Sequence, residues 1–205
     1  MLSGMSPRTT RARPLSRDER REAILTAVTP LLIEKGAMVT TAEMAEAAGI
    51  AEGTIFRAFP DKAELLHEAV RAVMDPGPAG RALAEIPADL PLDTQLTEAC
   101  VILAAHFERI AALVGMVRSM PHPVEKPSGD AHRFAVESMA EITASVASIV
   151  ERHSEQLAMD SARVAVALRG LIFTNAHPLL ATEEKLTPAE IVHVVLHGIG
   201  PRKAT

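Results

Sequence analysis

The sequence lacks tryptophan and tyrosine, and its five phenylalanines account for an aromatic content of only 2%. Hydrophobic residues nevertheless make up 48% of the chain. A core must therefore be built from Ala, Leu, Ile, Val and Met, and these residues suit packed helices better than sheets. We expect an all-α fold.

Cysteine is almost absent as well, since Cys100 is the only one in 205 residues. A single cysteine excludes an internal disulfide. Cys100 lies on an apolar stripe without a basic neighbour in sequence, which favours a buried structural thiol over a redox sensor. The N-terminus has no apolar run long enough for a signal peptide or a membrane span, so we expect a cytoplasmic protein without a membrane partner.

The chain also lacks an excess of positive charge, because its formal net charge is −5. Residues 1–74 carry ten Lys/Arg and ten Asp/Glu, so the whole negative excess lies in the remainder. Residues 1–21 contain two acidic residues, Asp18 and Glu19, and six arginines: Arg8, Arg11, Arg13, Arg17, Arg20 and Arg21. Composition leaves two interpretations of residues 1–16 open, a flexible basic arm that assists DNA binding or a solvated tail.

Helix signals are dense in the first third of the chain. Ser16 and Glu19 form a capping-box pattern at the start of a helix over about 17–35, which contains Pro30. Thr40 and Thr41 then precede a short helix over 42–48, which Gly49 ends, and a second short helix over about 51–59 stops at Pro60. Two short helices joined by a tight turn have the right size to place one helix end in a DNA major groove.

The rest of the chain is expected to be helical. A fourth helix runs from Asp61 to about Asp75, and the Pro-rich segment 75–91 predicts a joint with at most a helical turn at 81–85. Longer helices are predicted from Asp93 to Pro121, with a break near Arg109 or Gly115, and over 130–157, 160–180 and 187–198. The last two helices carry more apolar surface than a monomer needs, which predicts a homodimer interface.

The segment TTAEMAEAAGIAEGTIFRAFPDKAELL, after a first helix ending in EKG, closely resembles the DNA-binding domain of the TetR family of bacterial transcriptional regulators. The resemblance covers about residues 17–75. It implies a helix-turn-helix DNA-binding domain over 17–75 and a helical ligand-binding and dimerisation domain over 76–205. It further implies a repressor that binds a palindromic operator as a homodimer and is released by a small molecule.

The same resemblance implies the DNA-contacting residues. Thr41 would cap the second helix and touch a phosphate, and Lys62 would meet the DNA backbone. The full implied set is Thr40, Thr41, Ala51, Glu52, Gly53, Thr54, Phe56, Arg57 and Lys62. The family commonly has lysine at Glu52 and tyrosine at Phe56. Glu52 could accept a hydrogen bond from a cytosine, or it could be a solvent-facing acid favoured by the helix dipole.

Regulators of this type bind ligands between the C-terminal helices, in mostly apolar cavities. The candidates for such a pocket are His106, Phe107, Met116, Met120, Phe134, Met139, Phe173, Asn175 and His177. Each of them could equally be an ordinary core residue, and His177 could simply cap helix carbonyls.

Catalytic and metal signals are weak. His193 and His197 are four residues apart on a predicted helix, but Val194 stands where the zincin pattern requires Glu. We therefore expect no metal, no cofactor and no enzymatic activity. Two alternatives stay open at this point: an all-α enzyme that uses the C-terminal pocket, and an interaction module that does not bind DNA.

Overall fold

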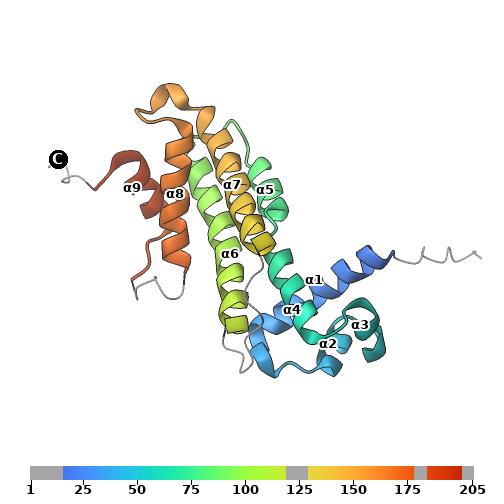
Figure 1. Cartoon of the computed structure of the whole chain (residues 1–205). Helices are drawn as coiled ribbons and strands as arrows, with labels where there is room; N and C mark the ends of the chain where they lie inside the picture. Colours follow the sequence, from blue (N-terminus) through green and yellow to red (C-terminus); the bar gives the residue numbers. More distant parts are fainter. Residues whose placement is uncertain (1–15, 119–128, 178–183, 200–205) are drawn as a thin grey trace, which may run out of the picture.

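The computed structural model describes residues 16–118, 129–177 and 184–199, and within these ranges the chain is all-α, as predicted. The N-terminal arm, Met120 and the loop at Pro121 lie outside the described residues. The helices are α1 (Arg17–Lys35), α2 (Thr41–Ala47), α3 (Glu52–Ala58), α4 (Lys62–Met74), α5 (Gly77–Ala84), α6 (Leu92–Arg118), α7 (Gly129–Glu151), α8 (Ser161–Ala176) and α9 (Pro188–His197), with 3-10 turns η1 (Gly36–Met38) and η2 (Ser154–Gln156). Figure 1 shows α1 to α4 at one end of the molecule and α5 to α9 at the other.

The expected helix starts are present because the capping residues make their bonds. The Ser16 hydroxyl accepts a hydrogen bond from the Glu19 backbone, and the Glu19 carboxylate accepts one from the Ser16 backbone. Asp61 caps α4, Asp160 caps α8, and Thr187 forms a capping box at α9. Each cap satisfies backbone N–H groups that a helix start leaves without partners.

One hydrophobic cluster holds α1 to α4 together. Its fully buried members include Val28, Leu32, Met44, Ile55 and Phe59. The cluster also contains Leu113 and Met116 from the far end of α6. The short helices α2 and α3 are therefore stable because they share a core with α1, α4 and α6.

A second hydrophobic cluster holds α5 to α9, with Leu96 and Leu103 of α6 among its fully buried members. Because α6 contributes to both clusters, it connects the two ends of the molecule (Figure 1). Among the described helices, α6 is the one that is long and apolar enough to cross a membrane by length and composition. Here it packs against α1, α4, α8 and α9, which is the position of a core helix.

Three expectations about the helices were wrong. The segment expected to be a joint contains α5, an eight-residue helix. Pro76 is its N-cap and Pro78 lies in its first turn, where the missing N–H costs no helical hydrogen bond. Ala79 and Leu83 are buried and anchor the helix against α6 and α7.

The second correction is that α6 is continuous through Arg109 and Gly115. Burial of Leu113 and Met116 on either side of the exposed Gly115 holds that turn in place. The third is that α7 ends at Glu151, not near Leu157. Val150 is the last buried residue of α7, and the chain beyond it turns into η2.

Candidate nucleic-acid interface

The helix α3 is buried on one side and exposed on the other. Ile55 and Ala58 are buried against the N-terminal core, and Phe59 just after the helix is fully buried. Glu52, Gly53, Phe56 and Arg57 are exposed, and the Phe56 side chain remains 51% exposed. The candidate DNA-contacting residues of α3 therefore lie together on its free face, apart from Thr54, which is half-buried.

The turn between α2 and α3 is formed by Gly49, which has a φ of 64°. The Gly49 N–H donates to the Glu46 carbonyl at 3.0 Å, and the Ile50 N–H donates to the Ala45 carbonyl at 2.9 Å. These two bonds form a Schellman motif, in which only glycine adopts the left-handed conformation without strain. The predicted cap is thus present, and it sets the angle at which α3 leaves α2.

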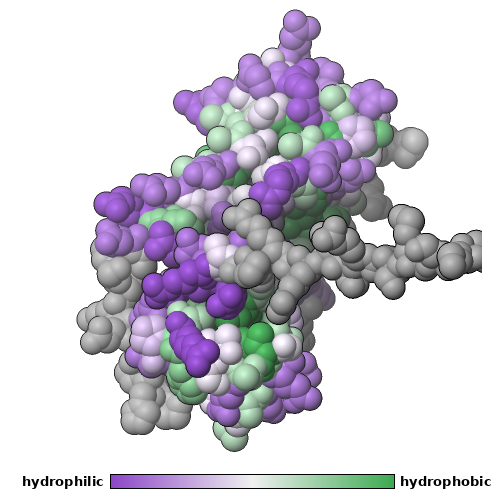
Figure 2. Space-filling model, turned by 90° about the vertical axis from the view of Figure 1, so that its right-hand side faces the viewer, coloured by the Kyte–Doolittle hydropathy of each residue, from purple (hydrophilic) through white to green (hydrophobic). Residues whose placement is uncertain are grey.

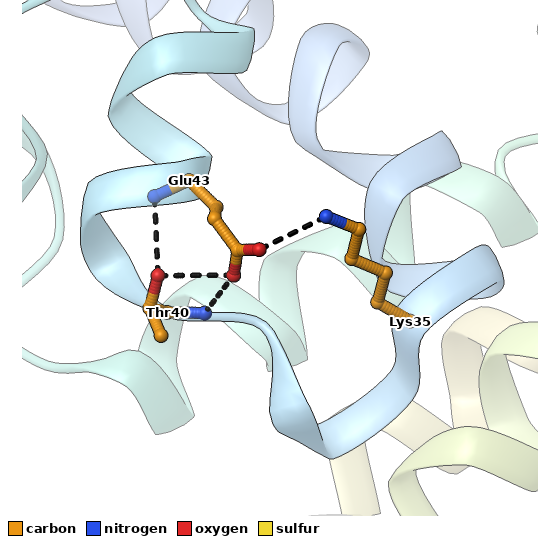
Figure 3. A network of polar contacts seen from close by, with 3 residues as sticks. All are labelled: Lys35, Thr40 and Glu43. Atoms are coloured by element: carbon orange, nitrogen blue, oxygen red, sulfur yellow. Dashed lines mark hydrogen bonds and ion pairs between the residues drawn. The ribbon is translucent and has the colours of Figure 1, made fainter.

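Figure 3 shows the polar network at the start of α2. The Glu43 N–H donates to the Thr40 hydroxyl at 3.2 Å, and the Thr40 N–H donates to the Glu43 carboxylate at 2.8 Å. Lys35, at the end of α1, donates to the same carboxylate at 2.9 Å. The expectation that Thr41 caps this helix was wrong: Thr40 is the N-cap, and Thr41 is the first helical residue.

This network shifts two pKa values. The hydrogen bond from the Thr40 backbone, followed by those from Lys35 and the Thr40 hydroxyl, lowers the pKa of Glu43 to about 2. The bond to Glu43 and its negative charge raise the pKa of Lys35. The carboxylate therefore stays ionised and connects α1 to α2 at any pH at which DNA is bound.

Lys62 has an intramolecular role besides its predicted one. Its ammonium group donates to the Val39 carbonyl at 2.7 Å and is half-buried. This bond connects the first residue of α4 to the segment before α2. Because an ammonium group has three donors, a phosphate contact by Lys62 stays a prediction, and the structure adds an anchoring role to it.

Arg21 makes several polar contacts at this end of the molecule, whereas the sequence indicated it only as one of the six arginines within residues 1–21. Its guanidinium donates to the Ala58 carbonyl at the end of α3 and pairs with Glu68 of α4 at 2.8 Å. It also lies 3.6 Å from Glu64 and 4.5 Å from the ring centre of Phe59. The side chain is only 16% exposed, so Arg21 holds α1, α3 and α4 together.

The candidate ligand residues that the structure describes lie in different surroundings. Phe107 is buried in the C-terminal core and Met116 in the N-terminal core. Phe134 lies under the guanidinium of Arg71, and Asn175 is bonded to the backbone of Leu186. The ring of Phe107 contacts that of Phe173, which in turn contacts the ring of His177. Met139 packs against the C-terminal core. Met120 lies outside the described residues.

His106 is different from the other candidates. It is 2% exposed, and its Nε2 has no hydrogen-bond partner in the described parts of the chain. Burial, followed by the charge of Arg109, lowers its pKa, and the opposing effect of Asp75 is smaller. The ring is therefore neutral near pH 7, and it leaves one buried polar atom unsatisfied.

His106 lines an open cleft of about 1000 Å³ that is formed by residues of α1, α4, α5 and α6 and by Asp75 between α4 and α5. Among the candidate ligand residues that the structure describes, His106 is the one that lines this cleft. The lining residues are Asp18, Arg21, Glu22, Leu25, Thr26, Thr29, Pro30, Ile33, Glu68, Ala72, Val73, Asp75, Pro78, His106 and Arg109. The face of the molecule from which α1 projects is mainly hydrophilic, with apolar residues between (Figure 2).

The remaining candidates for chemistry have ordinary surroundings. His193 and His197 are exposed on α9, with ring centres 5.0 Å apart. Across the three described ranges, no three His, Cys, Asp or Glu side chains gather as metal ligands would. Cys100 is 1% exposed, and burial raises its pKa to about 12.

A helix-turn-helix with an exposed second helix, set on a helical bundle, defines a helix-turn-helix DNA-binding protein. The model of the family described as bacterial regulatory proteins, tetR family, matches residues 24–69. The N-terminal domain of the chain is therefore similar to the DNA-binding domain of this family of bacterial regulatory proteins. The matched family consists of regulatory proteins, which favours a regulator over the all-α enzyme.

Solved structures share the fold over nearly the whole chain. A TetR-family transcriptional regulator from Mesorhizobium loti matches with a TM-score of 0.58 and 17% identity, over 89% of this chain and 94% of that one. The regulator SCO0520 from Streptomyces coelicolor has a TM-score of 0.57 and 20% identity, over 88% and 98%. FadR from Bacillus subtilis, solved in complex with stearoyl-CoA, has a TM-score of 0.56 and 16% identity, over 87% and 99%.

Proposed function

We propose that this regulator is a cytoplasmic repressor that binds a palindromic operator as a homodimer and releases it when a small molecule binds. The observation that carries the proposal is the exposed face of α3, where Gly53, Phe56 and Arg57 are open to solvent while Ile55 and Ala58 fix the helix to the core. Two such helices would enter successive major grooves about 34–36 Å apart.

A homodimer through α8 and α9 is supported by apolar side chains that the bundle leaves open. On α8, Val166 is 50% exposed and Phe173 is 39% exposed, and Ile199 after α9 is 89% exposed. These helices lie at the end of the molecule away from α2 and α3 (Figure 1). A dimer formed there would leave both copies of α3 free for DNA.

Release by a small molecule is supported by the way α6 joins the two cores. Leu113 and Met116 pack among residues of α1 to α4, while Leu96 and Leu103 pack in the C-terminal bundle. A ligand that displaces α6 or α4 therefore changes the position of the DNA-binding helices. Binding free energies require reciprocity, so operator and ligand must lower each other's affinity equally.

A gel shift with DNA from upstream of the chain's own coding sequence tests the DNA-binding part. Arg57→Ala should weaken operator binding and reduce the slope of log K against log salt by about 1, because it removes one cation from the phosphate interface. Arg133→Ala on α7 is the matched control, because that arginine is 69% exposed and far from α3 along the chain.

Two outcomes would contradict this function. If Arg57→Ala binds with wild-type affinity and salt slope, the DNA face is misplaced. If the wild-type protein shifts no DNA recovered from a genomic library, the remaining alternative, an interaction module that does not bind DNA, is favoured. Chromatography with light scattering tests the homodimer, and Phe173→Glu should shift the protein towards monomer.

A further inference from the structure

The exposed face of α3 carries an acid and an aromatic ring one helical turn apart, Glu52 and Phe56. Both side chains are exposed to solvent, and Phe56 is 51% exposed. We propose that these two side chains determine part of the operator sequence: Glu52 selects a cytosine in the major groove, and Phe56 selects a thymine through its methyl group. The inference rests on the proposed function, and it specifies bases that α3 contacts.

The carboxylate of Glu52 has no partner among the described residues. Glu19, Glu43 and Glu190 also lie in the first turn of a helix, and each accepts a hydrogen bond from the backbone N–H of its N-cap residue. The Glu52 carboxylate forms no hydrogen bond or ion pair within the described ranges, and α3 has no side-chain cap. It is therefore available to accept a hydrogen bond from another molecule.

The charge of Glu52 restricts the bases that it can contact. A carboxylate only accepts hydrogen bonds, so the acceptors that guanine and thymine present in the major groove repel it. Adenine has an amino group beside the acceptor N7, whereas the edge of cytosine has the N4 amino group and no acceptor. Because the DNA phosphates also repel the carboxylate, Glu52 favours a DNA site only where a cytosine donor compensates for that repulsion.

Gly53 provides an independent indication that another molecule approaches this face closely. Gly53 is exposed, its φ is not positive, and a Cβ atom there would meet nothing within 4 Å. The fold therefore does not require glycine at this position, although glycine weakens a helix. A missing side chain allows close approach to the backbone, and a base edge at Gly53 would lie beside Glu52 and within one turn of Phe56.

Phe56 complements the acid because its ring has no polar group. An exposed ring without a hydroxyl cannot donate a hydrogen bond to a phosphate, but it can contact the C5 methyl group of thymine. The Cβ atoms of residues one turn apart on a helix are about 5–6 Å apart, and base pairs are stacked about 3.4 Å apart. Each half-site should therefore contain the cytosine and the thymine within about two base-pair steps.

Selection from a random DNA library with the full-length protein, followed by sequencing, tests the cytosine. Both half-sites should contain it, and replacing its C·G pair by T·A should weaken wild-type binding about tenfold for each half-site changed. Glu52→Ala should bind the two DNAs with nearly equal affinity. Glu141→Ala on α7 is the matched control, because it removes the same charge from an exposed position elsewhere and should keep the wild-type preference. A purely structural role of Glu52 would leave the base preference unchanged.

Deoxyuridine tests the thymine without changing the protein. Replacing one thymidine in each half-site by deoxyuridine removes only a methyl group, and at the position that Phe56 contacts this should weaken wild-type binding about fourfold for each half-site. Phe56→Ser should be insensitive to the same replacement, and the other thymidines, replaced in turn, are the control. A circular dichroism melt identifies any variant that fails to fold, and the wild-type measurement does not depend on it.

Each half of the inference has a result that would overturn it. A selected site without cytosine, or a cytosine preference that survives Glu52→Ala, refutes the role of Glu52. Equal wild-type affinity for every deoxyuridine-substituted operator refutes the role of Phe56. In both cases the protein would still shift its selected DNA, so the proposed function would stand; failure to shift any DNA would refute that function instead.

Discussion

Arg21 offers the sharpest test of how this fold holds its recognition helix. Its guanidinium contacts the Ala58 carbonyl, the carboxylates of Glu64 and Glu68, and the ring of Phe59. Replacing Arg21 by Leu keeps the apolar stem and the helical propensity, and it removes all four polar contacts at once.

The expected loss of stability can be worked from these contacts. A hydrogen bond from a charged donor contributes about 1.5–3 kcal/mol, and a cation over an aromatic ring about 0.5–1 kcal/mol. The ion pairs add at most about 1 kcal/mol, because Glu64 and Glu68 are 45% and 35% exposed. These contacts share one group and do not add fully, so we expect Arg21→Leu to lower the unfolding free energy by about 2–3 kcal/mol.

Urea unfolding measures that loss, and operator binding distinguishes an anchor from a phosphate contact. Arg21→Leu should weaken operator binding at every salt concentration without changing the salt slope, because the guanidinium contacts protein and not DNA. Arg21→Lys should recover only part of the stability, since an ammonium cannot make the same set of contacts. A loss below about 0.5 kcal/mol, or a slope reduced as in Arg57→Ala, would refute the reasoning.

Three further predictions concern titratable groups. Because burial lowers the pKa of His106 from its ordinary 6.5, the unfolded chain binds the proton more readily, so stability should fall as pH drops below about 6.5; His106→Gln, followed by urea unfolding, should remove this part of the pH dependence. The Glu43 carboxyl should titrate by NMR with a pKa of about 2, so its stabilising network should persist at pH 4.5 and be lost only towards pH 2; a value near 4.5 would contradict the capping network. The Cys100 thiol, whose pKa burial raises to about 12, should react with a disulfide reagent at least roughly a hundredfold more slowly in the native protein than in urea, and equal rates would show that the thiol is open.

Local signals predicted the helices well because caps and periodicity act over a few residues. Ser16 with Glu19 gave the start of α1, and Gly49 gave the turn before α3. The caps at Asp61, Asp160 and Thr187 depend in the same way on nearby backbone groups. Helix α5 was missed because proline breaks a helix in most positions. Here the prolines lie at the start of the helix, and the burial of Leu83 against other helices, which the local sequence does not indicate, stabilises it.

Contacts between distant segments could not be predicted in the same way. Arg21 meets Ala58 across 37 residues, and Lys62 meets Val39 across 23. Buried Gln95 bonds to Arg152 and His153, and nothing in its local sequence marks it as buried. The ligand candidates stay a prediction for the same reason, because apolar periodicity identifies inward-facing residues without telling a cavity wall from a filled core.

These long-range contacts also change what a charge count means for DNA binding. The ten cations of residues 1–74 balance ten anions, but the cations are not equally available. Lys35 is paired with Glu43, Arg21 with Glu68, and Lys62 donates to the Val39 carbonyl. Three positive charges are therefore engaged in holding α1, α2, α3 and α4 together. Exposed Arg57 on α3 is not among them, so our proposal gives it the larger share of the phosphate contact. Operator affinity should accordingly depend more on the position of α3 than on the total charge of the domain.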